Sequence, residues 1–257
     1  MKLLRALRRW NAARAVPAAN PPSDGNGGTL RSKYMPPYGS KEVAGAVADS
    51  EKIIWVPPAS IRFKLRSAPI IAFRSSNVQY GEWDLNRRKI EETAKFHSVM
   101  QHFRDGLDWE DTEIFRRYAV RLGRGEVIRG CRTIAELKVV YRTDMNVLYQ
   151  SLNRNGFLLH QARKKKRNDL PHVYVARDGE IIFGSEGNHR LAMARLLEFD
   201  EIGCRVMGRH ADWQALRERL FESDIGSRRR LLGHVLAKHP DLQDLLGQGA
   251  AIRGDQT

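Results

Sequence analysis

The chain has little cysteine and no long apolar run, and both scarcities limit what it can be. Its two cysteines among 257 residues, Cys131 and Cys204, lie far apart and in no metal-ligand spacing. This excludes a disulfide framework and indicates a reducing, intracellular compartment. No stretch approaches the roughly 18 consecutive apolar residues of a membrane span, so we expect a cytoplasmic protein. Cys204 alternates with Ile202 and Val206, which predicts a core position on a strand.

Acidic residues are also in the minority. The chain has 30 Asp and Glu against 44 Lys and Arg, a formal net charge of +14. Such a surplus favours polyanionic partners, which include nucleic acid, nucleotides and an anionic membrane surface, without choosing among them. A chain of this length can form one large domain or two small ones.

The first 50 residues differ from the rest. Residues 1–10 carry four basic and no acidic residues, and their apolar residues recur at helical spacing. We therefore interpret residues 1–16 as a basic amphipathic segment that could make peripheral membrane contact; a frayed arm or a helix docked on the domain is the alternative. Residues 17–50 are rich in Pro, Gly, Asn and Ser, which predicts a flexible linker.

A β-hairpin is predicted near the middle of the second half. Residues 172–176 and 180–183 are apolar runs rich in β-branched side chains, and Arg177-Asp178-Gly179 joins them. Asp-Gly between two such runs is typical of a tight turn that needs positive φ. Residues 191–197, Leu-Ala-Met-Ala-Arg-Leu-Leu, favour a helix immediately afterwards.

The segment Gly184-Ser-Glu-Gly-Asn-His-Arg190 lies where this hairpin leads into the helix. Free N–H groups and the helix dipole make such a junction favourable for anions, phosphate above all. Glycines allow close approach of a ligand to the backbone, and Asn188 can cap the helix. His189 and Arg190 would occupy the first helical turn, a poor place for cations unless an anion binds there. The alternative is a capped helix start with solvated His and Arg.

Residues 187–194, Gly-Asn-His-Arg-Leu-Ala-Met-Ala, resemble the Gly-x-His-Arg-x-x-Ala signature of the ParB/sulfiredoxin-like superfamily. Residues 148–156 are similar to a helix-and-glycine element that precedes this signature in ParB N-terminal domains. Residues 199–206 resemble the short strand that follows it. The similarity covers about residues 144–210. It implies an α+β fold with a small mixed β-sheet of ParB/sulfiredoxin type, a helical insertion and C-terminal helices.

The resemblance also implies a nucleotide site, occupied by ATP, ADP or CTP with Mg²⁺. Carried over to this chain, the phosphate-binding positions are Gly184, Gly187, Asn188, His189 and Arg190. Sulfiredoxin has Cys where this chain has Asn188, so its thiol chemistry is absent here. Chromosome-partitioning ParB proteins have Gly-Glu-Arg-Arg; the His-Arg form looks more like the ParB-like free-serine kinases and phage ParB-like proteins.

Candidate catalytic carboxylates are Asp84 and, less favoured, Glu186. Residues 78–85 are similar to the strand-and-loop box that opens ParB-type domains and contributes to their nucleotide pocket. Asp84 could hold Mg²⁺ or act as a base, because a metal beside a triphosphate usually takes only one or two protein carboxylates. Trp83 could stack on a base. The alternative is a turn Asp and a packed Trp.

The expected domain comprises residues 51–210, with strands at 52–56 and 70–73. A helical insertion at about 86–140, broken near Gly106 with Asp108 as a cap, could carry a second substrate or partner site. The next helix is predicted to open at Thr143 and to close at Gly156. Residues 211–257 form C-terminal helices and a tail, and Asp212 is a candidate cap. No recognition helix with a Gly-containing turn is evident.

A run of five cations precedes the hairpin, and it is either a polyanion-binding segment or a mobile basic loop. Its members are Arg163, Lys164, Lys165, Lys166 and Arg167. Two functional classes follow. One is a nucleotide-dependent phosphotransferase or hydrolase; the other is a nucleotide-gated or nucleotide-independent module that binds DNA, RNA or a membrane. A nuclease ranks last, because no two-metal carboxylate cluster is present. The oligomeric state is not determined by the sequence.

Overall fold

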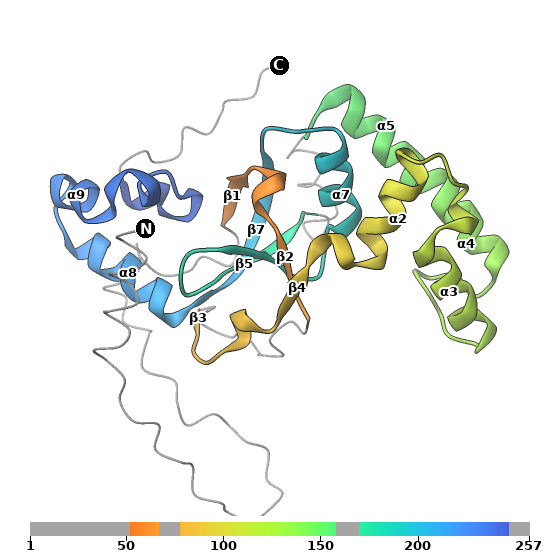
Figure 1. The fold of residues 1–257 in the computed structure, drawn as a ribbon, viewed down its shortest axis with the longest axis horizontal. Helices are drawn as coiled ribbons and strands as arrows, with labels where there is room; N and C mark the ends of the chain where they lie inside the picture. The colour runs from red at the N-terminus through yellow and green to blue at the C-terminus, as the bar shows by residue number, and fades with distance from the viewer. Residues whose placement is uncertain (1–51, 67–77, 158–169, 247–257) are drawn as a thin grey trace, which may run out of the picture.

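The computed structural model describes residues 52–66, 78–157 and 170–246, which contain a seven-stranded mixed sheet and seven α-helices (Figure 1). The strand order is β1-β7-β5-β6-β2-β4, and β3 also pairs with β7. The strands are β1 (Ile53–Val56), β2 (Phe63–Leu65), β3 (Val78–Gln79), β4 (Arg87–Lys89), β5 (His172–Val175), β6 (Ile181–Phe183) and β7 (Ile202–His210). The predicted small mixed sheet with helices is therefore confirmed, whereas its ParB/sulfiredoxin type stays a prediction.

The predicted hairpin is confirmed. Strands β5 and β6 pair in antiparallel register, with Val173 opposite Phe183. Gly179 in the turn has a φ of +86° and lies so close to the Trp213 ring that a Cβ would come within 2.5 Å of it. Asp178 Oδ1 accepts a hydrogen bond from the Glu180 N–H at 3.0 Å. Both the left-handed backbone and the packing therefore require glycine at this position.

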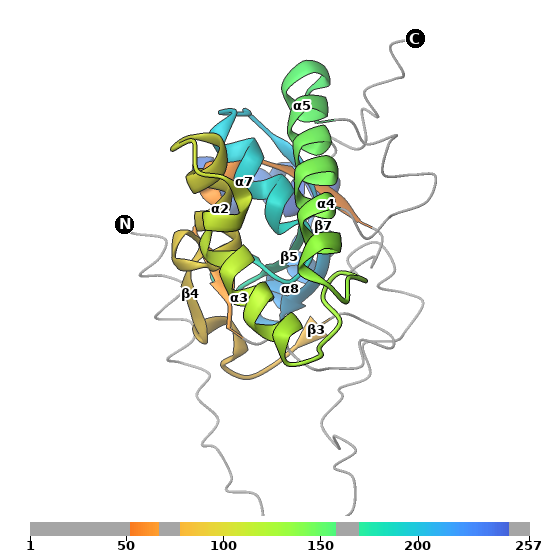
Figure 2. The ribbon, with the colours of Figure 1, turned by 90° about the vertical axis from the view of Figure 1, so that its right-hand side faces the viewer.

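Helices α2 (Ala94–Phe103), α3 (Glu113–Gly123), α4 (Ile134–Val140) and α5 (Asn146–Asn155) form the predicted helical region. The expectation that a helix opens at Thr143 is wrong. A π-helical turn, Tyr141–Met145, joins α4 to α5, so the chain is already helical there; Figure 2 shows the two helices as one nearly continuous rod. Gly156 ends α5 with a φ of +68°, as predicted. Asp108 makes no side-chain cap hydrogen bond to the short 3-10 helix that follows it.

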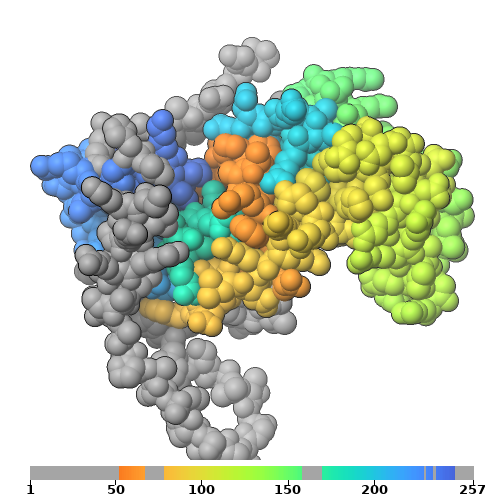
Figure 3. Space-filling view, viewed as in Figure 1, coloured from red at the N-terminus to blue at the C-terminus, as the bar shows by residue number. Residues whose placement is uncertain are grey.

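The remaining helices are α7 (Asn188–Leu196), α8 (Ala211–Glu222), α9 (Ile225–Leu236) and the 3-10 helix η8 (Pro240–Leu246). The predicted cap at Asp212 is wrong, because His210 caps α8 and its Nδ1 accepts from the Asp212 N–H at 3.1 Å. Figure 3 shows α2–α5 projecting from one side of the sheet-bearing body, with α8 and α9 at the opposite side.

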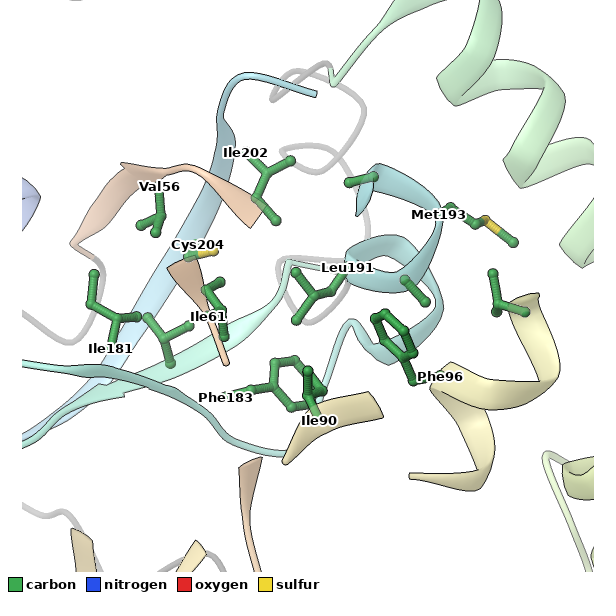
Figure 4. Close-up of a cluster of buried hydrophobic side chains, with 14 of the residues drawn as sticks. Val56, Ile61, Ile90, Phe96, Ile181, Phe183, Leu191, Met193, Ile202 and Cys204 are labelled. Atoms are coloured by element: carbon green, nitrogen blue, oxygen red, sulfur yellow. The ribbon is translucent and has the colours of Figure 1, made fainter. Parts of the chain in front are cut away.

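Alternate residues of the strands divide the apolar side chains between two clusters. Val173, Ile181 and Phe183 belong to the larger cluster, together with Leu191 of α7 and side chains of α2 (Figure 4). Tyr174 and Ile182 belong to a smaller cluster. This alternation is what the period of two in a strand requires. The face that α7 and α2 cover is therefore the one that carries Phe183 and its neighbours.

Cys204 is fully buried on β7 in the larger cluster, which confirms its predicted core position. In the described ranges, no helix is both long enough and apolar enough to cross a membrane. Five predictions lie outside the described residues: the amphipathic segment 1–16, the linker 17–50, the strand 70–73, the basic run 163–167 and the C-terminal tail, residues 247–257.

Candidate anion-binding site

The site is built around the start of α7. Gly187 precedes the helix with a φ of +78°, and a Cβ there would lie 2.5 Å from the backbone N and Cα of Pro171. Any larger residue would be both strained and in collision with main chain. Gly184 has a different explanation: a Cβ would lie 2.7 Å from the Tyr174 ring, so packing alone requires glycine there.

Asn188 does not cap the helix, which corrects the sequence-based prediction. It is the first residue of α7, and no side chain caps that helix within the described residues. Its Nδ2 donates to the Ser185 carbonyl at 2.6 Å, and its Oδ1 accepts from Lys64 Nζ at 3.2 Å. Gly187 at the N-cap position therefore offers no side-chain acceptor at the positive end of the helix dipole.

Lys64 of β2 and Arg88 of β4 lie on the sheet beside this helix start. They are direct cross-strand partners, and Lys64 is also in register with Phe183, the last residue of β6. Lys64 Nζ lies 4.9 Å from the centre of the Phe183 ring. Like charges at directly opposed positions destabilise a sheet. This pair is therefore unfavourable unless an anion lies between them.

Two further cations reach the same place from the helical region. Lys95 lies on α2, which packs against α7. Arg129 precedes α4, has a left-handed φ of +53°, and places its guanidinium carbon 5.7 Å from the centre of the Tyr141 ring. The Tyr141 ring centre is 6.1 Å from that of His189. We call Lys64, Arg88, Lys95 and Arg129 the cationic cluster.

The proximity of these charges lowers the pKa values of Lys64, Lys95 and the neighbouring His189. Burial, followed by the charges of Lys95 and Arg88, lowers the pKa of Lys64 to about 8. Burial, followed by Arg129, lowers the pKa of Lys95. Burial, followed by Arg129 and Lys95, lowers the pKa of His189 to about 3. His189 is therefore neutral near pH 7, and the alternative of a solvated histidine is wrong, because only 8% of it is exposed.

One carboxylate opposes this charge among the described residues. Glu186 is exposed, and its charge raises the pKa values of Lys64, Lys95 and His172. Arg190, the last residue of the motif, lies half-buried in the first turn of α7. Among the described residues, Glu186 is thus the carboxylate that acts on Lys64 and Lys95.

Several buried polar atoms at the site have no hydrogen-bond partner among residues 52–66, 78–157 and 170–246. They are Nε of Arg88, Nε2 of His172, Nε2 of His189 and the hydroxyl of Tyr141. Buried polar groups are nearly always paired in proteins, so a group of unpaired ones indicates a missing ligand, ion or water. All four can donate a hydrogen bond, each histidine nitrogen when it carries the proton, and an oxygen-rich anion accepts such bonds.

Asp84 lies elsewhere. It is 1% exposed and accepts two hydrogen bonds from the Arg177 guanidinium, at 2.9 and 2.7 Å. Burial would raise its pKa, but the hydrogen bonds from Arg177 outweigh that effect and lower it. Arg177 lies at the turn of the hairpin, and the segment 184–190 begins at the opposite end of the hairpin. At about 3.3 Å per residue of extended strand, these two ends are roughly 16 Å apart. The structure therefore does not bring Asp84 to the helix start.

Trp83 packs rather than presenting a free face. Its ring lies 5.8 Å from that of Tyr174 in an edge-on contact, and its Nε1 donates to the Gln79 carbonyl at 3.4 Å. The packed alternative thus describes Trp83. No group of three or more His, Cys, Asp or Glu side chains that could hold a metal ion occurs in the described residues.

Sequence reasoning located the helix start but missed the four cations of the cluster. A signal for one of them exists in residues 61–65, Ile-Arg-Phe-Lys-Leu, where Lys64 sits between apolar residues of a short strand. Arg88 lies in a polar segment that looks like solvated surface, and no motif or repeat in the sequence marks Lys95 or Arg129.

Comparison of the chain with models of protein families, with curated proteins and with solved structures finds no match. The ParB/sulfiredoxin-like resemblance stays a prediction, and the function has to be argued from the geometry of the site.

Proposed function

We propose that this protein binds a nucleotide through its phosphate groups at the start of α7. The observation that carries the proposal is the convergence of the cationic cluster on an uncapped helix start. Like charges held close together are unfavourable, the more so where Lys64, Arg88 and Lys95 are half-buried, and a phosphate would relieve that repulsion while accepting hydrogen bonds from the donors. The resemblance to the ParB/sulfiredoxin-like superfamily agrees with this ligand, as does the net charge of +14.

One described carboxylate could hold Mg²⁺ at this site. The ion usually enters with the phosphates and takes only one or two protein carboxylates. Glu186 is the described carboxylate that acts on the cluster, whereas Asp84 is held by Arg177. We therefore assign Glu186, rather than Asp84, as the residue that would hold a metal brought by ATP, ADP or CTP.

The position of Glu186 also favours a second candidate function, nucleotide hydrolysis or phosphoryl transfer. An enzyme of this class needs a carboxylate near the transferred group to orient or deprotonate the acceptor. If Glu186 has this role, wild type releases inorganic phosphate from a nucleoside triphosphate and Glu186→Gln does not, although it still binds the nucleotide. Equal phosphate release by the two proteins would remove Glu186 from catalysis.

Calorimetric titration with ATP, ADP, CTP and GTP, each with Mg²⁺ in moderate salt, tests binding itself. We expect micromolar binding of at least one nucleotide, weakened at least about tenfold in Arg88→Gln. The matched control is Lys89→Gln, which removes one cation from the next, exposed position of β4. Equal binding by the two variants, or no binding by wild type, would overturn the proposal; titration with DNA, RNA and anionic vesicles would then test the basic surface.

A further inference from the structure

We propose that His239 is an acid-sensitive latch that fastens the C-terminal 3-10 helix η8 to the turn of the β5–β6 hairpin. In Figure 1 this turn lies on the side of α8, at the end of the hairpin opposite α7. Protonation of the His239 ring would open the latch and leave η8 more weakly held. The latch lies outside the candidate anion-binding site and does not depend on the proposed function.

Both ring nitrogens of His239 are engaged, and their partners differ in kind. Nδ1 accepts a hydrogen bond from the backbone N–H of Asp241, in the first turn of η8, at 3.1 Å. Nε2 lies 2.8 Å from the carbonyl oxygen of Gly179, in the hairpin turn, and donates to it. A backbone N–H can only donate and a carbonyl oxygen can only accept, so Nε2 carries the ring proton and Nδ1 does not. The contacts therefore require a neutral ring in one tautomer.

A second proton on the ring would go to Nδ1, which faces the Asp241 N–H. Two donors would then face each other across 3.1 Å, and the hydrogen bond to η8 would be lost. The ring has little room to turn away, because its centre lies 4.5 Å from that of the Trp213 ring. Gly179 packs against the same tryptophan. The charged form of His239 is therefore incompatible with the contacts that join η8 to the hairpin.

The charged groups that act on His239 come from three described elements. Asp241 belongs to η8, Lys52 directly precedes β1, and Arg217 lies on α8. Burial lowers the pKa of His239 below the usual 6.5, and the charges of Lys52 and Arg217 add to this effect. The charge of Asp241 and the hydrogen bond to Gly179 oppose it without cancelling it. The surroundings of the ring thus favour the neutral form that its hydrogen bonds require.

The sign of the pH effect follows from this lowered pKa. The unfolded chain binds a proton at His239 more readily than the folded chain does. The stability that the latch contributes is therefore fully present above about pH 6.5 and is lost as the pH falls through the folded pKa. Burial would raise the pKa values of Asp241 and Asp244, but Arg217 and the neighbouring cations lower both, so these carboxylates stay ionised in this range.

A second histidine has the same arrangement but different surroundings. His210 accepts the Asp212 N–H on Nδ1 at 3.1 Å, and its Nε2 donates to the carbonyl oxygen of Gly81 at 2.8 Å. The Asp212 carboxylate lies 3.6 Å from Nδ1 and can pair with a proton placed there. The Asp241 carboxylate beside His239, by contrast, already accepts hydrogen bonds from an arginine and a tryptophan. We therefore assign the latch to His239.

Hydrogen exchange of the full chain tests the latch, with each rate corrected for the intrinsic pH dependence of exchange. The amide protection factors of residues 241–246 should fall at least about threefold between about pH 7.5 and about pH 5. His239→Asn should abolish this fall, because Asn Oδ1 can accept the Asp241 N–H but takes up no proton in this range. The control is His97→Asn, which changes an exposed histidine on α2 and should keep the fall.

Unchanged protection of η8 in wild type would overturn the proposal, and so would an equal fall in wild type and His239→Asn. The ring nitrogen resonances of His239 in wild type provide a test that needs no substitution. At neutral pH they should report a neutral ring with its proton on Nε2, and they should move to the charged form as η8 loses protection. A proton on Nδ1 at neutral pH, or loss of protection while the ring is still neutral, would contradict the latch.

Discussion

Cations gather in two parts of this molecule, and their surroundings differ between the two. Where β7 meets the C-terminal helices, Arg209 and Arg217 are almost fully buried beside Asp241, which is itself fully buried. Arg209 donates two hydrogen bonds to the Asp241 carboxylate, at 2.8 and 2.5 Å, and Trp213 Nε1 donates another at 2.9 Å. At the start of α7, by contrast, four cations meet around the exposed Glu186.

The difference is the one expected between a structural charge network and a binding site of the kind proposed above. At Asp241, buried arginines bond directly to the carboxylates of Asp241 and Asp244, and the network ties η8 to β7 and α8. At the cationic cluster, the carboxylate that acts on Lys64 and Lys95 is the exposed Glu186. Protein interiors rarely retain such a deficit without a use for it. We therefore expect substitutions at the first place to change stability and substitutions at the second to change binding.

Asp241→Asn should have the largest effect on stability. It leaves Arg209 buried without its carboxylate, whereas Arg217 keeps its hydrogen bonds to Asp244. Breaking a buried pair in this way typically costs about 3–5 kcal/mol. Chemical denaturation measures the loss in the free energy of unfolding. The control is Asp105→Asn, which alters an exposed carboxylate and should leave stability unchanged. Equal stability of the two variants would mean that the network does not hold η8 in place.

Asp84→Asn should have an intermediate effect and separates two roles for Asp84. The ion pair with Arg177 is buried on the Asp84 side and part-buried on the other, so its loss should cost about 2 kcal/mol. Nucleotide affinity should stay unchanged, because Asp84 lies at the other end of the hairpin. Loss of binding without loss of stability would instead place Asp84 in the site, as the sequence pattern suggested. Asp111→Asn, at an exposed ion pair, is the control.

The local parts of this fold could be predicted, and the long-range parts could not. The hairpin turn, the junction at Gly187 and the end of α5 at Gly156 follow from residues next to one another in the chain. Thr143 shows where local signals fail. It resembles a helix cap, but Tyr141 and Met145 are both buried, and their packing keeps the chain helical through that position.

The candidate site, like the fold, has a local part that the sequence predicts and a long-range part that it does not. The anion-favouring segment 184–190 is visible in the sequence, because strand, glycine and helix signals meet there. Lys64, which bonds Asn188, is 124 residues away from it in the chain. No local pattern shows that β2, β4 and α2 come together at this helix start. Asp84 illustrates the converse, since its partner Arg177 is 93 residues away and takes the carboxylate out of the site.

Lys95→Met tests the cationic cluster. It should raise the free energy of unfolding, whereas Asp241→Asn should lower it. It removes a part-buried cation whose described neighbours include Arg129 and Glu186, so we expect the free protein to gain about 1 kcal/mol. Nucleotide affinity should fall at the same time. Lys238→Met, at an exposed lysine beyond α9, should do neither. A destabilised Lys95→Met variant would show that the cluster is compensated in the free protein.

The smallest effect concerns pH and Lys64, whose pKa is about 8 in the folded chain and about 10.5 in model peptides. Below pH 8 both states hold the proton. Between pH 8 and 10.5 the folded state releases it while the unfolded state keeps it, so Lys64 makes the free protein more stable as pH rises through this window. Phosphate affinity should move the other way and fall a few-fold between pH 7 and 9, because Lys64 loses its charge. Calorimetry at both pH values measures this fall, and Lys64→Gln should flatten it. If Lys64→Gln keeps the same slope, another group controls it and the charge of Lys64 does not contribute to binding.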